Sequence, residues 1–417
     1  MLDKRKGIIT INKTDLVFFC ISAIMIMPTY FTNNAIMKLL GNACAVFVFY
    51  TLFIRYYKPS KFAYTIAAYY IYIVINTFLN KSGDIHSIIS SAKVVFMVGF
   101  IDYMFAKRMH KAVDILFYII FIYVLIDFFS VMLFPDGLYK IKIEWNQWSS
   151  SDFAQWIFGN KNNHEFWFIT LLMLAYIRYY LLDTKIRKYL LIFIAAINII
   201  TPLVLHSSTS LTVSVIAVSG IYLSHVKSKI KIRIEPYIVL AVYAVVTMLI
   251  VFGSVSFLAP VVKGLFSKDL TFSNRTSAWE TVLTLIPQKP IFGFGDLSNA
   301  DAISTLGSKA FVNSHNQWLE IFWQGGLVLF LITVFLINIV IRKLKKCLNI
   351  DFVNTLIIIL TAYFIEMIFE VGLGNVVAWC PLLFCYYAVN LENAAMKKSE
   401  MKKTDMAEAP IDKLITD

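Results

Sequence analysis

Apolar stretches about as long as a membrane-spanning helix recur along the chain, and short polar segments separate them. A helix needs roughly 20 mostly apolar residues to cross the hydrocarbon core of a bilayer, with a tolerance of about 17 to 25. With that window the pattern predicts about twelve transmembrane helices. They lie at about 14–31, 35–54, 62–79, 85–106, 112–134, 163–182, 188–206, 208–225, 236–259, 317–341, 352–370 and 374–391. The predicted fold class is therefore an all-α polytopic membrane protein with one transmembrane domain over residues 1–391.

Basic residues are distributed asymmetrically between the two ends of these helices. Lys and Arg cluster before the first predicted helix and after each even-numbered one, as at 107–111, 185–188 and 342–346. Cytoplasmic loops of membrane proteins carry such an excess of Lys and Arg, so we expect both termini in the cytoplasm. The tail at 392–417 alternates Lys with Glu and Asp and lacks apolar periodicity, and it is predicted to be disordered.

Composition narrows the class of protein further. Apolar residues make up 59% of the 417-residue chain and charged residues only 15%, whereas soluble domains carry roughly 25% charged residues. The net charge of +12 follows from the one-sided Lys and Arg clusters, so we expect membrane lipids and no nucleic acid as partners. The cysteines lack metal-ligand spacing, and the sequence has no Asp-x-Asp, P-loop or His-Glu-x-x-His motif. We therefore expect no metal site and no nucleotide-binding domain.

Two predicted outer loops, at 135–162 and 260–316, are longer than the other connections. In the second loop, Ser277 and Glu280 fit a capping box, Ser/Thr-x-x-Glu, which predicts a helix. Arg275 stands just before this helix. A guanidinium beside the N–H groups and the positive end of a helix can bind a phosphate or a diphosphate. On spacing alone, the alternative is an arginine that lies in solvent.

The segment 313–320 ends the second outer loop and reads Asn-Ser-His-Asn-Gln-Trp-Leu-Glu. Asn313 or Ser314 can cap a helix that continues into the tenth span, interrupted by the glycines at 325–326. His315 would then lie in the first helical turn, where the helix dipole disfavours the imidazolium and keeps a neutral base available. Such a base could remove a proton from a sugar hydroxyl. The alternative is a histidine that only helps to cap the helix.

The first outer loop ends in a polar segment at the mouth of the sixth predicted helix. Its candidate side chains are Asn160, Lys161, Asn162, His164 and Glu165. Amides and charged groups of this kind can bind sugar hydroxyls or a phosphate.

Carboxylates at the outer end of the eleventh predicted helix are candidates for a supporting role. Glu366 and Glu370 are four residues apart and share a helix face. They could orient His315 or an arginine. Asn316 and Glu320, in the segment that carries the histidine, are further supporting candidates.

A competing class of protein is a secondary transporter or flippase. Ionisable residues within membrane spans are costly and often functional, and Glu366, Glu370, Asp127 and Lys93 could form an ion path. Such transporters usually show paired halves or broken helices at the membrane midplane. The sequence shows neither, and the long outer loop would have no role.

Three motifs of the long loop occur in an order typical of one family. They read Asn-Arg-Thr-Ser-Ala-Trp at 274–279, Pro-Ile-Phe-Gly-Phe-Gly at 290–295, and His-Asn-Gln-Trp-Leu-Glu at 315–320, followed by Gly-Gly at 325–326. Together with the hydropathy pattern they resemble the O-antigen ligase and polymerase family of bacterial envelope glycosyltransferases.

The resemblance implies a GT-C-like membrane transferase in the bacterial inner membrane. The family uses a glycan on undecaprenyl diphosphate at the outer face, with no metal or other cofactor. By position, His315 would activate the acceptor hydroxyl and Arg275 would hold the diphosphate. A flippase and a chain-length regulator are the candidate protein partners.

One feature departs from the family pattern. Members often carry Ser-Arg in the short turn between the two spans that correspond to the seventh and eighth, and this turn lacks Arg. The second diphosphate-binding cation would then be Lys161 or His206. We interpret the chain as a repeat-unit polymerase for O-antigen or capsular polysaccharide. A ligase, which transfers the glycan to lipid A-core, remains an open alternative.

Overall fold

The protein is described by a computed structural model, which covers residues 12–82, 85–146, 149–225, 232–252, 275–306 and 312–407. The helices are α1 (Lys13–Met25), α2 (Thr29–Thr32), α3 (Ala35–Ile54), α4 (Lys61–Leu79), α5 (Ile85–Leu133), α6 (His164–Leu181), α7 (Lys185–Val204), α8 (Ser208–His225), α9 (Pro236–Val251), α11 (Arg275–Leu285), α12 (Asn299–Leu306), α13 (Gln317–Leu344), α14 (Ile350–Phe369), α15 (Val376–Tyr386) and α16 (Ala388–Ala407). The strands are β1 (Tyr139–Asn146) and β2 (Ser149–Gln155).

The all-α polytopic membrane fold predicted from the sequence is confirmed. Each predicted span coincides with one or more of these helices, and α5 contains two of them. Among the described helices, six are long and apolar enough to cross a membrane, and α8, α9 and α15 are shorter apolar helices. The first predicted span is shortened because the chain leaves the helix before Pro28, whose ring cannot continue it.

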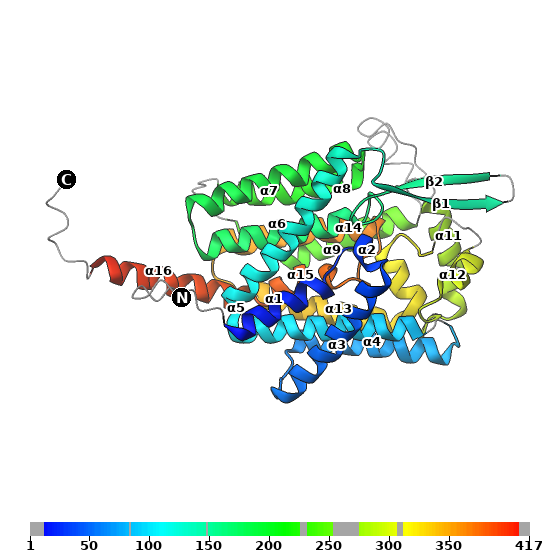
Figure 1. The fold of residues 1–417 in the computed structure, drawn as a ribbon, viewed down its shortest axis with the longest axis horizontal. Helices are drawn as coiled ribbons and strands as arrows, with labels where there is room; N and C mark the ends of the chain where they lie inside the picture. Colours follow the sequence, from blue (N-terminus) through cyan, green and yellow to red (C-terminus); the bar gives the residue numbers. More distant parts are fainter. Residues whose placement is uncertain are drawn as a thin grey trace.

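The two spans within α5 meet at a kink. Arg108 has φ −146° and ψ 49° inside the helix, and its Nη1 lies 2.8 Å from Oδ1 of Asp15 in α1. The helix axis of α5 therefore changes direction at the basic segment 107–111. In Figure 1, α1 begins and α16 ends at one end of the bundle, whereas the β-hairpin, α11 and α12 lie at the opposite end.

The helix at the centre of the bundle, α6, is much more buried than α3 at the edge. Every residue of α6 from His164 to Arg178 is buried, because α5, α7, α8, α14 and α15 pack around this helix. By contrast, only Gly41, Ala45 and Val48 of α3 are buried. An apolar helix that leaves most of its surface uncovered, at the edge of the bundle in Figure 1, suits contact with lipid.

The first outer loop contains a β-hairpin that the sequence analysis does not predict. β1 and β2 are antiparallel, and Tyr139 pairs with Gln155 and Ile141 with Phe153. Lysines alternate with these apolar residues of β1, which is the period of a half-exposed strand. The hydropathy window is too long to register so short an alternation.

The C-terminal tail also differs from its prediction. A disordered segment is expected from residue 392, but α16 continues to Ala407, and residues 408–417 lie outside the described part. Two contacts anchor the beginning of this helix. Leu391 is fully buried, and the Glu392 carboxylate accepts hydrogen bonds from the backbone N–H groups of Leu348 and Asn349. The helix therefore starts in the core and extends away from the bundle, as Figure 1 shows.

Candidate active site

The N-terminus of α13 places His315 just outside the helix. Asn316 is the N-cap residue, and its Oδ1 accepts hydrogen bonds from Trp318 N at 2.9 Å and Leu319 N at 3.0 Å. The capping residue predicted from the sequence, Asn313 or Ser314, is therefore wrong, and so is the place of His315 in the first turn. Because Asn316 caps the start of α13, His315 lies just before the helix. Its backbone has a left-handed conformation, with φ 48°.

Two interactions hold this unusual backbone. The His315 N–H donates to Asn313 Oδ1 at 2.9 Å, and the buried Ser314 N–H donates to the Glu320 carboxylate at 2.8 Å. Asn316 Nδ2 also donates to the carbonyl oxygen of Ile368 at 2.9 Å, which ties the start of α13 to the end of α14. The imidazole is thus presented from a turn that is fixed on both sides.

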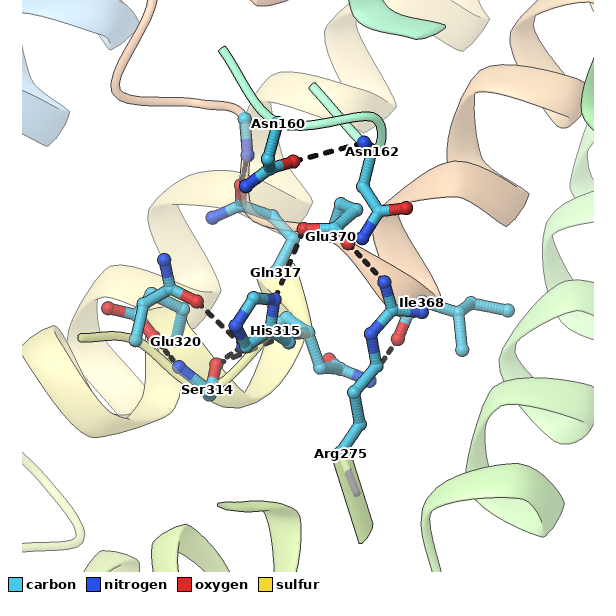
Figure 2. Close-up of polar contacts among 12 residues, drawn as sticks. Asn160, Asn162, Arg275, Ser314, His315, Gln317, Glu320, Ile368 and Glu370 are labelled. Atoms are coloured by element: carbon cyan, nitrogen blue, oxygen red, sulfur yellow. Dashed lines mark hydrogen bonds and ion pairs between the residues drawn. The ribbon is translucent and has the colours of Figure 1, made fainter. Parts of the chain in front are cut away.

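Glu370 connects the histidine to the arginine of the other motif. This residue ends α14 in an extended conformation, with φ −143° and ψ 156°. Its Oε1 forms an ion pair with Nη2 of Arg275, and its Oε2 lies 3.2 Å from Nδ1 of His315 (Figure 2). We call Arg275, Glu370 and His315 the His–Glu–Arg cluster. The structure therefore brings together two side chains that the sequence places in separate motifs.

The cluster is largely shielded from water. The exposed fractions of the side chains are 11% for Arg275, 5% for Glu370 and 18% for His315. Electrostatic interactions are stronger at such sites than at an open surface. Of the three side chains, His315 has the largest exposed fraction.

Helix α11 carries Arg275 and is anchored by its apolar face. Ala278, Trp279 and Val282 are buried, and the Trp279 ring lies 6.4 Å from the ring of Phe369 at the end of α14. The helix already includes Arg275, so it begins earlier than the capping box at Ser277 predicts. The guanidinium consequently lies in the first turn described, beside the positive end of the helix dipole.

The glycine motif at 290–295 has a structural role. α13 is broken at Gly326, which has φ 58° and ψ −155°. The loop at 290–295 packs over this break and forms backbone hydrogen bonds with α13. Among them are Phe294 N to Trp323 O at 2.8 Å and Gly295 N to Gln324 O at 2.9 Å. A Cβ atom on Gly293 would lie 2.6 Å from this backbone, so the close approach requires glycine. The break fixes the direction in which the first turns of α13 point.

The geometry assigns distinct chemical roles within the cluster. A carboxylate can only accept a hydrogen bond, so Glu370 selects the tautomer of His315 in which Nδ1 carries the proton. In that tautomer the lone pair is on Nε2, which is the form of the ring that can accept a proton there. On the other side of the carboxylate, the guanidinium can bind a phosphate or a diphosphate.

Residues 191–334 match the family model described as O-antigen ligase. Over this range the chain is similar to the O-antigen ligase family. The resemblance noted from the loop motifs is thereby confirmed. A comparison with curated proteins finds no match.

The O-antigen ligase domain contains Arg275 and His315 but ends before Glu370. The carboxylate that joins the two motif residues is therefore contributed by a part of the chain outside the matched range. The domain begins within α7 and ends within α13, so it also includes the break at Gly326.

The first outer loop reaches the same site. Asn160 and Asn162 appear in the close-up of the His–Glu–Arg cluster, on the side of Glu370 away from the Arg275 backbone (Figure 2). Asn160 Oδ1 accepts a hydrogen bond from Asn162 N at 3.0 Å, which shapes the turn. Lys161 lies between them and is exposed. The structure thus places these three candidates on one turn, with both amides beside the cluster.

Other predicted site residues lie inside the bundle. His164 Nδ1 is 2.7 Å from Oδ2 of Asp127, and both side chains are buried. Glu165 accepts a hydrogen bond from Ser214 Oγ at 2.9 Å. Glu366 is fully buried, and among the described residues neither of its carboxylate oxygens has a hydrogen-bond partner. Burial favours a supporting role for His164, Glu165 and Glu366 over direct contact with substrate.

His206 lies elsewhere on the outer-loop end of the bundle. It is exposed on the turn between α7 and α8, with φ 50°. The neighbouring Leu205 packs in a small apolar cluster with Val131 and Trp156. Within the described part of the chain, the structure does not join His206 to the His–Glu–Arg cluster, so Lys161 is the better candidate for a second cation.

Two positioning residues are missed by the sequence analysis. Gln317 Oε1 accepts hydrogen bonds from Gly372 N at 2.9 Å and Leu373 N at 3.0 Å, and so holds the chain just after Glu370. Asn76 Nδ2 donates to Phe292 O at 2.6 Å and fixes the glycine motif. Gln317 could have been suspected from its place beside the motif histidine, whereas Asn76 has no sequence signal.

No three His, Cys, Asp or Glu side chains within the described part of the chain are grouped in a way that could hold a metal ion.

Proposed function

We propose that this membrane protein is a polysaccharide repeat-unit polymerase. It transfers a glycan from undecaprenyl diphosphate to a hydroxyl group of a lipid-linked acceptor, at the outer face of the bacterial inner membrane, with both termini in the cytoplasm. The O-antigen ligase family supports a role in polysaccharide assembly. The observation that carries the proposed chemistry is the shared contact of Glu370 with Arg275 and His315.

The proposed reaction has one bond formed and one broken. The acceptor oxygen attacks the anomeric carbon of the donor glycan, and the bond from that carbon to the diphosphate oxygen breaks. The acceptor proton moves to Nε2 of His315. The imidazolium that forms is stabilised by Glu370, as the carboxylate of a Ser-His-Asp triad stabilises its histidine.

The diphosphate leaves with additional negative charge, which fixed positive groups stabilise best. A guanidinium has five N–H donors, and its described contact with Glu370 uses only Nη2. Arg275 can therefore bind the diphosphate while the ion pair persists. We assign Lys161 as the second cation. Asn160 and Asn162 would bind sugar hydroxyls, because their turn lies beside the cluster.

A ligase is the second candidate function. The family description itself favours it, and a ligase would use the same donor chemistry with lipid A-core as the acceptor.

The transporter alternative is less well supported. Asp127 pairs with His164, and Glu370 contacts Arg275 and His315, whereas Lys93 lies on α5 beside α3. Lys93 therefore lies apart from the carboxylates with which it would have to form an ion path.

The product formed from donor alone distinguishes these functions. Purified protein in proteoliposomes receives only the undecaprenyl-diphosphate-linked repeat unit, and the products are separated by size. A ladder of lengthened lipid-linked glycans is expected. Product that forms only after lipid A-core is added would replace the polymerase by a ligase. Glycan that crosses the bilayer without covalent change would support a transporter.

The polymerase proposal also implies partners. A flippase would deliver the donor to the outer face, and a chain-length regulator would set the size distribution of the product.

A further inference from the structure

A pair of lysines lies within the apolar, lipid-facing part of the bundle. Lys38 is about one turn after the start of α3, and Lys93 is about two turns after the start of α5. Charged side chains at such positions are rare because hydrocarbon does not solvate them. Neither lysine belongs to the His–Glu–Arg cluster, so these charges require a separate explanation.

The two lysines lie at the junction of α3 and α5. A Cβ atom on Gly41 would lie 3.6 Å from Nζ of Lys93, so this ammonium is directed at the glycine of α3. Lys38 is three residues before Gly41, so the two residues are neighbours on one face of α3. A lysine that simply reached toward water could separate from its neighbour, whereas this ammonium turns toward the helix that carries the second charge.

α3 carries a further polar group close in sequence to Lys38. The Asn42 side chain, one turn after Lys38, has a buried amide oxygen without a hydrogen-bond partner among the described residues. Amide oxygen and nitrogen are nearly indistinguishable by shape, so this amide can equally present its NH2 donors. Within the described part of the chain, no carboxylate forms an ion pair with Lys38 or Lys93.

The junction of α3 and α5 that carries the lysines lies near the two long loops. α2, which leads into α3, is held by Tyr30 N donating to Ile157 O at 3.2 Å in the first outer loop. The start of α5 is held by Ser87 Oγ donating to Asp296 at 2.5 Å in the second outer loop. Both lysines are therefore close to the outer-loop end of the bundle. Large apolar side chains on the same part of α3 are exposed and available to acyl chains: Ile36, Leu39 and Leu40.

We propose that Lys38 and Lys93, assisted by the Asn42 amide, bind the phosphate of an anionic membrane lipid at the junction of α3 and α5. A phosphate between the two ammonium groups would remove their repulsion and supply the missing counter-charge. The exposed apolar face of α3 would contact the acyl chains of the same lipid. This site does not depend on the proposed glycosyltransfer, because none of its residues belongs to that machinery.

The test measures lipid binding directly. Detergent-solubilised protein is titrated with phosphatidylglycerol, and bound lipid is counted by native mass spectrometry, with zwitterionic phosphatidylcholine as the control lipid. Each lysine near a membrane surface contributes roughly fivefold to the binding of anionic lipid. The Lys38→Gln/Lys93→Gln double variant is therefore expected to bind phosphatidylglycerol roughly 30-fold more weakly. The matched Lys81→Gln/Lys140→Gln variant loses the same charge and is expected to bind like the unmodified protein.

A second variant separates loss of binding from loss of folding. Gly41→Ala keeps both charges and places a methyl group 3.6 Å from Nζ of Lys93, which is an ordinary van der Waals contact, so it is expected to weaken phosphatidylglycerol binding with an unchanged melting temperature. Equal binding by the unmodified protein and the double lysine variant would overturn the proposal, as would equal binding of the two lipids.

Competition identifies the source of the phosphate. Displacement of phosphatidylglycerol by equimolar undecaprenyl phosphate supports the site and assigns it to a polyprenyl lipid. Retention of phosphatidylglycerol supports the site and assigns it to ordinary anionic phospholipid. Displacement by inorganic phosphate at the same low concentration would contradict the assignment to a lipid.

Discussion

Replacement of Glu370 by Gln is the sharpest test of the cluster, because it removes one charge and almost no volume. A glutamine carbonyl can still accept a hydrogen bond from Arg275, but its NH2 group then faces His315. That NH2 group can only donate, so Nδ1 of the imidazole must accept. The proton moves to Nε2, and the nitrogen that should receive the acceptor proton is blocked.

The expected loss of rate follows from these contacts. The Glu370 side chain is only 5% exposed, so solvent screens its charge weakly. A hydrogen bond to a charged group contributes about 1.5–3 kcal/mol, which corresponds to a slowing of roughly 10- to 150-fold. Reversal of the histidine tautomer adds to this loss, and in the Ser-His-Asp triad the equivalent change costs about 10,000-fold. We expect Glu370→Gln to slow glycan transfer between about 100-fold and 10,000-fold.

The assay is the initial rate of lipid-linked glycan lengthening in proteoliposomes that contain equal amounts of folded protein. Glu280→Gln is the matched control, because this carboxylate is exposed on α11 and its loss should leave the rate unchanged. A Glu370→Gln variant with a native melting temperature and more than half of the normal rate would refute the role assigned to the carboxylate.

Three further substitutions test the site and its scaffold. His315→Ala should slow transfer by about 100- to 10,000-fold in the same rate assay, whereas His110→Ala, an exposed histidine at the opposite end of the bundle, should not; equal rates would contradict the base assignment. Arg275→Lys should raise the KM for the lipid-diphosphate donor by roughly tenfold, because an ammonium cannot form the guanidinium fork; an unchanged KM in donor titrations would argue against a diphosphate contact. Gly326→Ala should lower stability by about 1–3 kcal/mol in thermal unfolding, because its φ is 58° and a Cβ would lie 2.5 Å from the packed loop. Gly374→Ala, with nothing within 4 Å of its Cβ, is the control, and equal melting temperatures would show that the helix break tolerates a side chain.

Hydropathy predicts the helices of this protein because the transfer of a segment into lipid depends mainly on the residues of that segment. The spans at 35–54 and 208–225 coincide with α3 and α8. The hairpin at β1 and β2 is missed because its alternation is shorter than the window used for spans. The tail helix α16 is missed because its first turns depend on contacts with the loop before α14.

The candidate site could be predicted only in part. Motif order suggests that Arg275 and His315 lie close together, and both side chains contact Glu370 in the structure. The partner that joins them cannot be derived from spacing, because Glu370 is 95 residues from Arg275 and 55 from His315. Polar loop residues are also ambiguous, since burial decides their role. His164 looks like an outer-loop ligand in sequence, but it is buried against Asp127.

The central claim is that His315 and Arg275, joined by Glu370, break the bond between a glycan and a lipid diphosphate. A single-turnover experiment with purified undecaprenyl-diphosphate-linked glycan tests it most directly, by measuring the released undecaprenyl diphosphate together with the lengthened glycan. The account predicts equal amounts of both products from the unmodified protein and a release at least about 100-fold slower from His315→Ala. Release at the normal rate from the variant, or no release by the unmodified protein when donor and acceptor are present, would contradict it.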